Sequence, residues 1–192
     1  MRDLRRLRPG RRRQFHGAGL DGRHDRGHVA GGIAAWDEAG DVAVVKRLGY
    51  VRDNFTRAET MDMLPGRQSL GHVRYSTTGA KGHTAIRDVQ PLYADFATGG
   101  FAIAHNGNLV NAEGLKRDLI ERGSIFQSSS DTEVIVHLMA RSFHRDPAER
   151  MKEALRRVEG AFSVVGMTAD KMIGVRDPRG IRPLVLGRLG EG

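Results

Sequence analysis

A long apolar run ends in two asparagines and a glycine in the stretch GGFAIAHNGNL, residues 99–109. Asn106 carries a side-chain N–H donor, and Gly107 carries a backbone N–H that no side chain shields. Two such donors can stabilise the oxyanion that forms when an amide carbonyl is attacked, and loss of one typically costs about 10²–10³ in rate. The same residues are also typical of an ordinary Asn-Gly turn. Taken alone, the stretch leaves both interpretations open.

Three other segments also place polar residues next to apolar runs, and each contains a charged side chain that could have a function. Arg74 lies in GHVRYSTTG (71–79), and its guanidinium could bind a carboxylate through two hydrogen bonds. Asp131 lies in SSSDTE (128–133), where it could pair with an ammonium group, cap a helix, or do both. The segment DPRGIRPL (177–184) fits a turn, so we interpret Arg179 and Arg182 as structural or interfacial residues.

Three histidines near these motifs could suggest a metal site. The spacing of His72, His105 and His137 matches no zinc-binding pattern. We therefore expect histidines that are hydrogen-bonded within the core, and we expect neither a metal nor a cofactor in this chain.

Hydrophobic periodicity indicates the elements that must position these residues. Strands are expected at both ends of the chain, the first two as a hairpin, and helices between them, which indicates the α+β class. The predicted strands are GGIAAWD (31–37), DVAVVKRLGYV (41–51), QSLGHVRYST (68–77), GGFAIAHNGNL (99–109), AFSVVGMT (161–168), KMIGVRD (171–177) and PLVLGRL (183–189). The fourth of these, GGFAIAHNGNL, is predicted to end in a polar turn. The predicted helices are NFTRAETMDML (54–64), AEGLKRDLIER (112–122), VIVHLMARS (134–142) and AERMKEALRRVEG (148–160).

Three helix starts carry recognisable capping residues. Asn111 is predicted to cap the helix that follows it. Ser130 and Glu133 fit a capping box, and Pro147 fits the first turn of the last helix.

The charge of the chain is concentrated at its beginning. The formal net charge is +8, yet residues 1–28 hold nine arginines and three aspartates, while the remainder holds 22 basic and 20 acidic residues. A body so close to neutral does not favour a general attraction to nucleic acid. The chain contains no cysteine, which excludes disulfides and thiolate metal sites and fits a cytoplasmic protein.

In combination, GHVRYSTTG, FAIAHNGNL, FQSSSDTEV and DPRGIRPL resemble the glutaminase domain of amidophosphoribosyltransferases, within the class II, N-terminal-nucleophile glutamine amidotransferases. The resemblance covers roughly residues 30–190. It implies a four-layer αββα sandwich, incomplete here at both ends. It also implies an enzyme that takes ammonia from glutamine and delivers it to phosphoribosyl pyrophosphate in the first step of purine biosynthesis.

The resemblance also implies roles for single residues. Asn106 and Gly107 would form the oxyanion hole, Arg74 would bind the α-carboxylate of glutamine, and Asp131 would bind its α-ammonium group. Arg26 would belong to the substrate-binding set, in a segment DRGHVAGGI (25–33) that matches the family only in part. The residues that follow Arg74, Tyr75 to Thr77, would shape the pocket.

The nucleophile of this family is a cysteine at the N-terminus of the mature chain, and its own α-amino group serves as the base. No cysteine is present, and no internal serine or threonine has a free α-amine. We therefore expect no glutaminase activity from the polypeptide as written.

One hypothesis accounts for both the missing cysteine and the arginine-rich opening. The segment MRDLRRLRP can be encoded so that a shift of one base reads Cys-Gly-Ile-Phe-Gly-Val-Phe-Gly, which is close to the start of the family pattern. We therefore expect residues 1–28 to be a frame-shifted, non-homologous reading and residues 29–192 to be a truncated glutaminase domain. Resequencing of the gene would test this.

Further expectations concern the rest of the protein and the alternatives. The phosphoribosyltransferase domain would be missing, together with its Mg²⁺ and the iron–sulfur cluster that some members carry, and the full-length protein would be a homo-oligomer that meets no membrane. The alternatives are another class II amidotransferase (the glucosamine-6-phosphate, asparagine or glutamate synthase types) or a non-catalytic remnant that binds glutamine. A nucleic-acid-binding protein that uses the arginine-rich arm is a third, less favoured alternative.

Overall fold

The computed structural model describes residues 28–66, 68–75 and 86–187. The chain divides into two compact units, one formed by residues 1–91 with 185–192 and the other by residues 92–184. Each unit has one antiparallel sheet, so each is described by itself.

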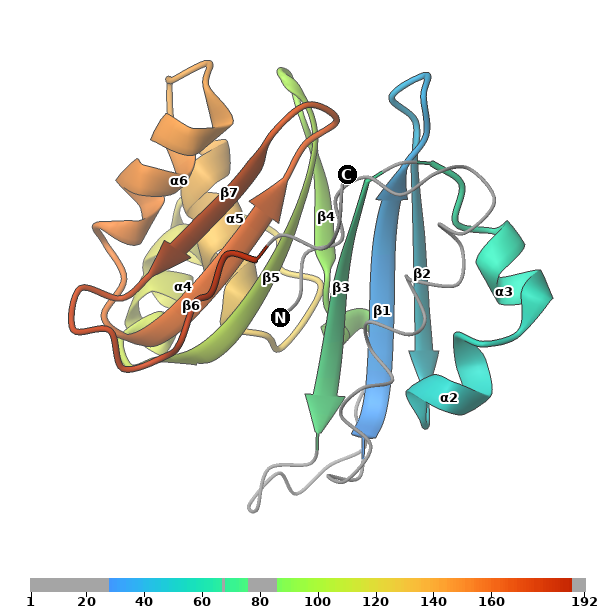
Figure 1. Ribbon diagram of the computed structural model, residues 1–192. Coiled ribbons are helices and arrows are strands. Elements are labelled where there is room, and N and C mark those ends of the chain that lie inside the picture. Colours follow the sequence, from blue (N-terminus) through green and yellow to red (C-terminus); the bar gives the residue numbers. More distant parts are fainter. Residues whose placement is uncertain (1–27, 67, 76–85, 188–192) are drawn as a thin grey trace. The chain divides into compact units, whose positions relative to one another are not determined.

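The first unit has a three-stranded sheet in the order β2-β1-β3 (Figure 1). Its strands are β1 (His28–Trp36), β2 (Val42–Leu48) and β3 (Gln68–Tyr75), and its short helices are α2 (Val51–Asn54), α3 (Ala58–Asp62) and the 3₁₀ turn η1 (Ile86–Asp88). The predicted hairpin is confirmed: Asp37 closes it by accepting hydrogen bonds from the backbone N–H groups of Ala39 and Asp41. The core of this unit consists of Ile33, Ala35, Val45, Val51, Phe55 and Leu64.

The helix predicted over residues 54–64 is wrong as a single element. The structure has two separate helical turns, α2 and α3, with residues 55–57 between them. Phe55 caps the end of α2 and is 1% exposed, because its ring packs into the core of the first unit. Burial of this aromatic ring outweighs the preference of the surrounding sequence for a continuous helix.

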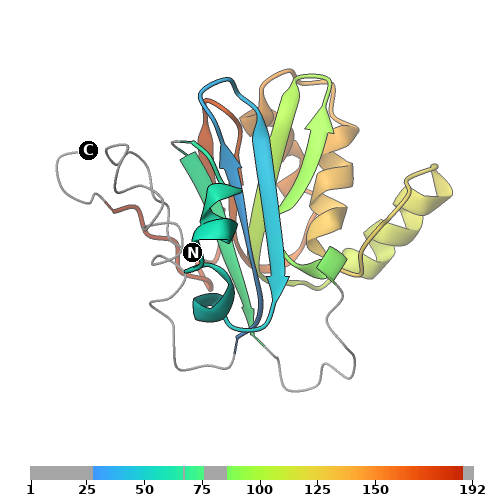
Figure 2. The same cartoon turned by 90° about the vertical axis from the view of Figure 1, so that its right-hand side faces the viewer.

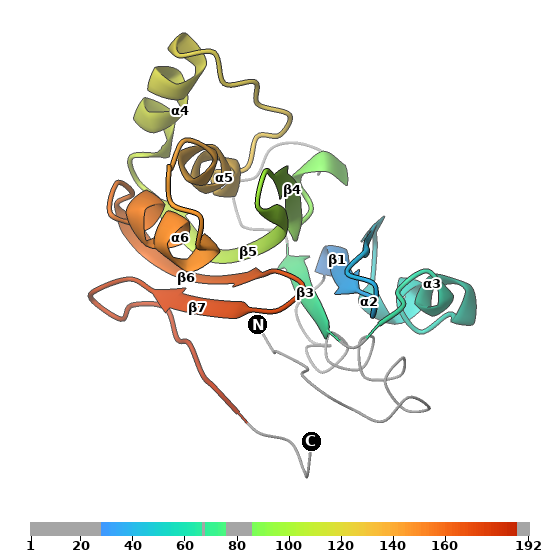
Figure 3. The ribbon, with the colours of Figure 1, turned by 90° about the horizontal axis from the view of Figure 1, so that it is seen from above.

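The second unit has a four-stranded sheet in the order β4-β5-β6-β7, with its helices on one face (Figure 3). The strands are β4 (Leu92–Phe96), β5 (Gly99–Leu109), β6 (Gly160–Met167) and β7 (Met172–Arg176); the helices are α4 (Ala112–Glu121), α5 (Thr132–Ala140) and α6 (Pro147–Leu155). Figure 2 shows α4 at the margin of this unit, beyond α5 and α6.

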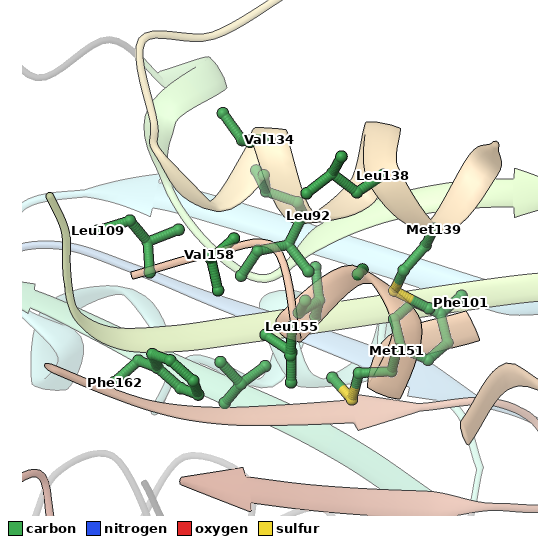
Figure 4. Packing of buried hydrophobic residues seen from close by; sticks show 14 of the residues in the cluster. Leu92, Phe101, Leu109, Val134, Leu138, Met139, Met151, Leu155, Val158 and Phe162 are labelled. Atoms are coloured by element: carbon green, nitrogen blue, oxygen red, sulfur yellow. The ribbon is translucent and has the colours of Figure 1, made fainter. Parts of the chain in front are cut away.

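The core of the second unit fills the space between the sheet and α5 and α6. Met139 of α5 and Met151 of α6 lie beside the aromatic ring of Phe101 in β5, and Leu138 of α5 belongs to the same buried cluster (Figure 4). These side chains are 0–4% exposed, so the hydrophobic effect holds the two helices on the sheet. The positions of β5 and of the start of α5, where the candidate residues lie, are fixed by this packing.

Of the predicted capping residues of α4 and α6, one differs from the structure and one agrees with it. Asn111 precedes α4 but makes no capping hydrogen bond. Its side chain instead donates to the carbonyl of Arg157 and accepts from the N–H of Glu159, which ties the end of β5 to the start of β6. Pro147 does begin α6, as predicted, after Asp146, whose carboxylate accepts from the N–H of Ala148.

Two strand predictions also need correction. β4 was not predicted, because its five residues LYADF mix apolar, acidic and aromatic side chains without a long apolar run. The strand predicted over residues 183–189 is wrong for residues 183–187, which have no regular structure and expose the side chains of Val185 and Leu186. Residues 188 and 189 lie outside the described part.

Within the described residues, no helix combines the length and the apolar character that crossing a bilayer requires.

Candidate functional site

Asn106 and Gly107 lie inside a strand and not in a turn. β5 continues to Leu109, and these two residues pair with Ser163 and Phe162 of β6. The polar turn expected at the end of this strand is therefore wrong, and so is the interpretation of Asn106 and Gly107 as an ordinary Asn-Gly turn. The pairing fixes the backbone of both residues, which is what an oxyanion hole requires of its donors.

Gly107 cannot be replaced by a larger residue without moving the sheet. Its φ is +156°, and a Cβ atom there would lie 2.0 Å from the carbonyl oxygen of Ala161 and 2.8 Å from Nε2 of His105. Real Cβ atoms do not approach other atoms so closely, so glycine is required by close backbone approach.

Asp131 is placed immediately before α5, and its carboxylate reaches back to β5. Oδ2 accepts a hydrogen bond of 3.0 Å from the backbone N–H of Leu109, and Oδ1 lies 3.6 Å from Nδ1 of His105. The side chain is 27% exposed, so part of the carboxylate remains accessible. The residue makes no side-chain capping bond, which leaves the carboxylate to these partners.

The surroundings of Asp131 favour its ionised form. Burial opposes ionisation, but the hydrogen bond and charge interaction with His105 and the N–H groups of Leu109 and Thr132 outweigh it and lower the pKa of Asp131. A carboxylate that stays ionised well into the acid range can bind an ammonium group throughout the neutral range.

Glu133 organises the loop that leads to Asp131. Its carboxylate accepts from the backbone N–H groups of Gln127 and Ser128 and from the hydroxyl of Ser128, at 2.6–2.8 Å. The predicted capping box is therefore only partly right: the glutamate at its expected position reaches back, but to residues 127 and 128 instead of to Ser130. The hydroxyl of Ser130 accepts a bond of 3.3 Å from the N–H of Thr132.

His105 is a core histidine, as predicted. It is 3% exposed, and Nδ1 lies 3.2 Å from the hydroxyl of Thr132. His137 packs against the ring of Phe126 and lies 3.7 Å from the carboxylate of Glu133. Among the described residues, no group of three or more side chains is arranged to hold a metal ion.

Arg74 belongs to the first unit, near the end of β3. It is half-buried, and its Nη1 donates to the carbonyl of Asp88 in η1 at 3.4 Å. This weak bond holds one end of the guanidinium against η1. Nearby, burial lowers the pKa of Lys46, while the charge of Asp88 acts in the opposite direction.

The turn that contains Arg179 and Arg182 is built around Asp177. This carboxylate is 2% exposed and accepts from the backbone N–H groups of Phe162, Arg179, Ile181 and Arg182. Burial opposes its ionisation, but these N–H groups together lower the pKa of Asp177. The turn forms one wall of a pocket of about 950 Å³ that none of the predicted binding residues lines.

The structure thus brings together the polar end of β5 and the start of α5. Asn106, Gly107 and Asp131 belong to the second unit and are linked through Leu109 and His105, whereas Arg74 belongs to the first unit. Arg26, Ser76 and Thr77 and the side chain of Tyr75 lie outside the described residues. His105, Thr132 and Glu133 were not predicted as parts of the site, although their position within the two motifs is a signal that could have indicated them.

Comparison with known proteins shows which family this chain belongs to. Residues 74–192 match the family described as "Glutamine amidotransferase domain". The chain belongs to the glutamine amidotransferase domain family. The match begins at the last two residues of β3 and spans all of the second unit, so Arg74, Asn106, Gly107 and Asp131 lie within it.

Curated relatives of this glutamine amidotransferase domain include two amidophosphoribosyltransferases. The chain is 47% identical over 171 residues to the amidophosphoribosyltransferase of Rhizobium etli, covering 89% of this chain and 34% of that protein. It is 43% identical over 167 residues to chloroplastic amidophosphoribosyltransferase 2 of Arabidopsis thaliana, covering 87% of this chain and 29% of that protein. The chain thus spans about a third of the length of these relatives.

Solved structures confirm the fold class. The glutamine phosphoribosylpyrophosphate amidotransferase of B. subtilis, complexed with ADP and GMP, superposes with a TM-score of 0.82 at 39% identity and covers 94% of this chain and 38% of its own. A glutamine aminotransferase class-II domain protein from Silicibacter pomeroyi shares the fold alone, with a TM-score of 0.56 at 14% identity, covering 77% of this chain and 68% of its own. The expected α+β sandwich of the N-terminal-nucleophile hydrolase type is therefore confirmed.

Proposed function

We propose that this chain is the glutaminase part of an amidophosphoribosyltransferase, which takes ammonia from the side-chain amide of glutamine and supplies it to phosphoribosyl pyrophosphate. The observation that carries this proposal is the junction of β5 and α5. There, two potential oxyanion donors on a rigid strand lie beside an ionised carboxylate, in a chain of the glutamine amidotransferase family.

In this proposal the two ends of glutamine are bound by different groups. Asp131 binds the α-ammonium group, because its carboxylate is ionised and partly exposed. Arg74, with Arg26, binds the α-carboxylate. Asn106 and Gly107 donate to the oxygen of the side-chain amide as it becomes an oxyanion, and their preorganised donors stabilise that charge more than the neutral carbonyl.

The proposal also covers what these 192 residues do as written. They contain no cysteine, so we propose that they bind glutamine without cleaving it. Cleavage would require a terminal cysteine whose thiolate attacks the amide carbon and whose α-amino group accepts the proton. The frame-shifted reading of residues 1–28 remains a prediction for gene sequencing to test.

The remaining expectations extend the same proposal to the longer protein. Phosphoribosyl pyrophosphate and Mg²⁺ would bind in the phosphoribosyltransferase part, which corresponds to the two-thirds of the relatives that this chain does not match. We place the protein in the cytoplasm as a homo-oligomer. The alternative of a glutamine-binding remnant is favoured by one observation, the missing cysteine.

Calorimetric titration of the full chain with L-glutamine tests the binding proposal. We expect saturable binding that Asp131→Asn weakens about tenfold or more, because the neutral amide can still accept the N–H of Leu109 but cannot pair with an ammonium group. Asp53→Asn, on an exposed aspartate of the first unit, is the matched control and should bind normally. A folded chain that does not bind glutamine would refute the proposal.

The catalytic part is tested on a chain whose opening has been restored to the alternative frame, so that it begins with cysteine. A diazo-ketone analogue of glutamine should then label that cysteine covalently, and the chain as written should remain unlabelled. Labelling of neither chain would count against the glutaminase assignment. That result would favour the alternative, a remnant domain that binds glutamine without cleaving it.

A further inference from the structure

His105 lies between the two parts of the proposed glutamine site. It precedes Asn106 in β5, pairs with Val164 of β6, and its side chain is 1% exposed. A buried imidazole in a sheet must find its hydrogen-bond partners within the protein, since burying an unpaired polar group costs free energy. The partners therefore show what the ring holds in place.

One edge of the ring faces the start of α5. Nδ1 lies 3.2 Å from the hydroxyl of Thr132 and 3.6 Å from Oδ1 of Asp131. An ionised carboxylate only accepts hydrogen bonds, so this environment favours a proton on Nδ1 and makes the ring a donor there. With Leu109 donating to Oδ2, both oxygens of Asp131 face donors on β5.

The other edge of the ring lies over Gly107. A Cβ atom on Gly107 would come within 2.8 Å of Nε2, so the imidazole takes up the space that a side chain would need. The alternation of side chains along a strand puts residues 105, 107 and 109 on one face, which is the face that α5 covers. A single ring therefore lies against both Gly107 and Asp131.

We propose that His105 is a positioning residue that connects the oxyanion donors of β5 to Asp131 and holds its carboxylate where the ammonium end of glutamine binds. This inference rests on the proposed function. Asp131 has two side-chain torsions, and a carboxylate fixed by donors at both oxygens loses little conformational entropy when the ligand arrives. His105 touches neither glutamine nor the reacting atoms; it acts through Asp131.

Two amide substitutions separate positioning from packing. In His105→Asn the side-chain amide can take the place of Nδ1, and in His105→Gln it reaches the place of Nε2 instead. Both variants are polar and remove the aromatic ring, so a purely structural role predicts similar losses in both. Positioning predicts that His105→Asn keeps most of the glutamine affinity of the unmodified chain and that His105→Gln loses about tenfold or more.

The measurements are glutamine affinity by calorimetry, melting temperature, and the titration of the Asp131 carboxyl group followed by NMR. We expect the pKa of Asp131 to rise toward its usual value in His105→Gln and to stay low in His105→Asn. In an Asp131→Asn background, His105→Gln should have no further effect on affinity, because the group through which it acts has already lost its charge.

The outcomes distinguish this inference from the proposed function. If the unmodified chain does not bind glutamine, the proposed function fails, while the titration of Asp131 in the two variants still tests whether His105 positions it. Equal affinities and equal Asp131 titrations in the two variants would overturn the inference even if glutamine binds. If His105→Gln does not fold, an unchanged Asp131 titration in His105→Phe would overturn it in the same way.

Discussion

At Asp131, burial and hydrogen bonding act on the same carboxylate in opposite directions. Burial favours the neutral acid, whereas the interactions with His105 and with the N–H groups of Leu109 and Thr132 favour the anion and prevail. Gly107 depends on its surroundings in another way, because the backbone of β6 and the ring of His105 occupy the space around its Cα. Asp131 depends in part on His105 and Leu109, which lie on another element, and Gly107 depends in part on the neighbouring strand β6.

At the residue scale, we expect Gly107→Ala to be strongly destabilising. The added methyl group would overlap the carbonyl oxygen of Ala161, so β5 and β6 must separate, at a cost of about 3 kcal/mol. Urea denaturation measures the loss. Gly114→Ala is the matched control: this glycine lies in α4 with open space around it, and alanine there should stabilise the protein by about 0.5–1 kcal/mol. An equal response of the two variants would contradict the close approach at Gly107.

At the element scale, the presence of the three longer helices and of most strands was predictable, because it depends on local patterns. The helix ends were less so: the helix predicted to reach residue 160 ends at Leu155. The strand β3, the hairpin of β1 and β2, and the start of α6 at Pro147 were all indicated by periodicity and punctuation. The extension of β5 through residues 106–109 was not, because it depends on pairing with β6, which is more than 50 residues further along the chain. Similarly, the side chain of Asn111 reaches residues 157 and 159 instead of capping α4.

The candidate site follows the same rule. Asn106, Gly107, Arg74 and Asp131 could be named from the sequence, because each lies in a recognisable motif. The partners of Asp131 could not, since His105 and Leu109 contact it only once β5 and α5 have packed together. Sequence therefore indicated candidate residues and not the contacts that hold them in place.

Also at this scale, Glu133 should make the loop before α5 sensitive to acid. Burial opposes ionisation, but the hydrogen bonds from Ser128 and Gln127 and the charge of His137 outweigh it, so the pKa of Glu133 lies below its usual 4.5. A folded-state pKa that is depressed gives stability above the unfolded pKa, and this stability is lost as the pH falls through the folded pKa. Glu133→Gln should therefore lose about 2 kcal/mol near pH 7 and show less loss of stability on further acidification.

Chemical denaturation at a series of pH values between neutral and strongly acidic checks this prediction. The control is Glu121→Gln, an exposed carboxylate at the end of α4, which should change stability at pH 7 by less than about 0.5 kcal/mol. If Glu133→Gln retained the full acid dependence of the unmodified chain, the assigned role of Glu133 would be wrong.

At the scale of the whole molecule, the two units differ in whether they consist of one continuous stretch of sequence. The second unit is one continuous stretch, residues 92–184, and every residue of its core cluster lies within it. The first unit takes residues from both ends of the chain. Three of the four described candidate residues lie in the continuous unit, so most of the proposed site is independent of the opening sequence.

The opening sequence governs the net charge instead. Nine of the 31 basic residues fall within residues 1–28, so we expect any binding of the chain to polyanions to depend on that segment. Replacing Arg11, Arg12 and Arg13 with glutamine should lower the salt concentration at which the chain leaves a heparin column. Replacing three scattered, exposed arginines, Arg52, Arg57 and Arg145, removes the same charge and should lower it less. Equal shifts would contradict a localised polyanion-binding segment.

The order of the strands in the second sheet has a consequence for how fast this unit folds. Two pairs of neighbouring strands are hairpins with short connections: β4 with β5, and β6 with β7. The strands of each hairpin can therefore pair early in folding. The central pairing of β5 with β6 must wait until the chain carrying α4, α5 and α6 has closed into a long loop. Asn106 and Gly107 lie in this central pairing, so we expect the proposed oxyanion donors to be assembled in the slowest step of folding.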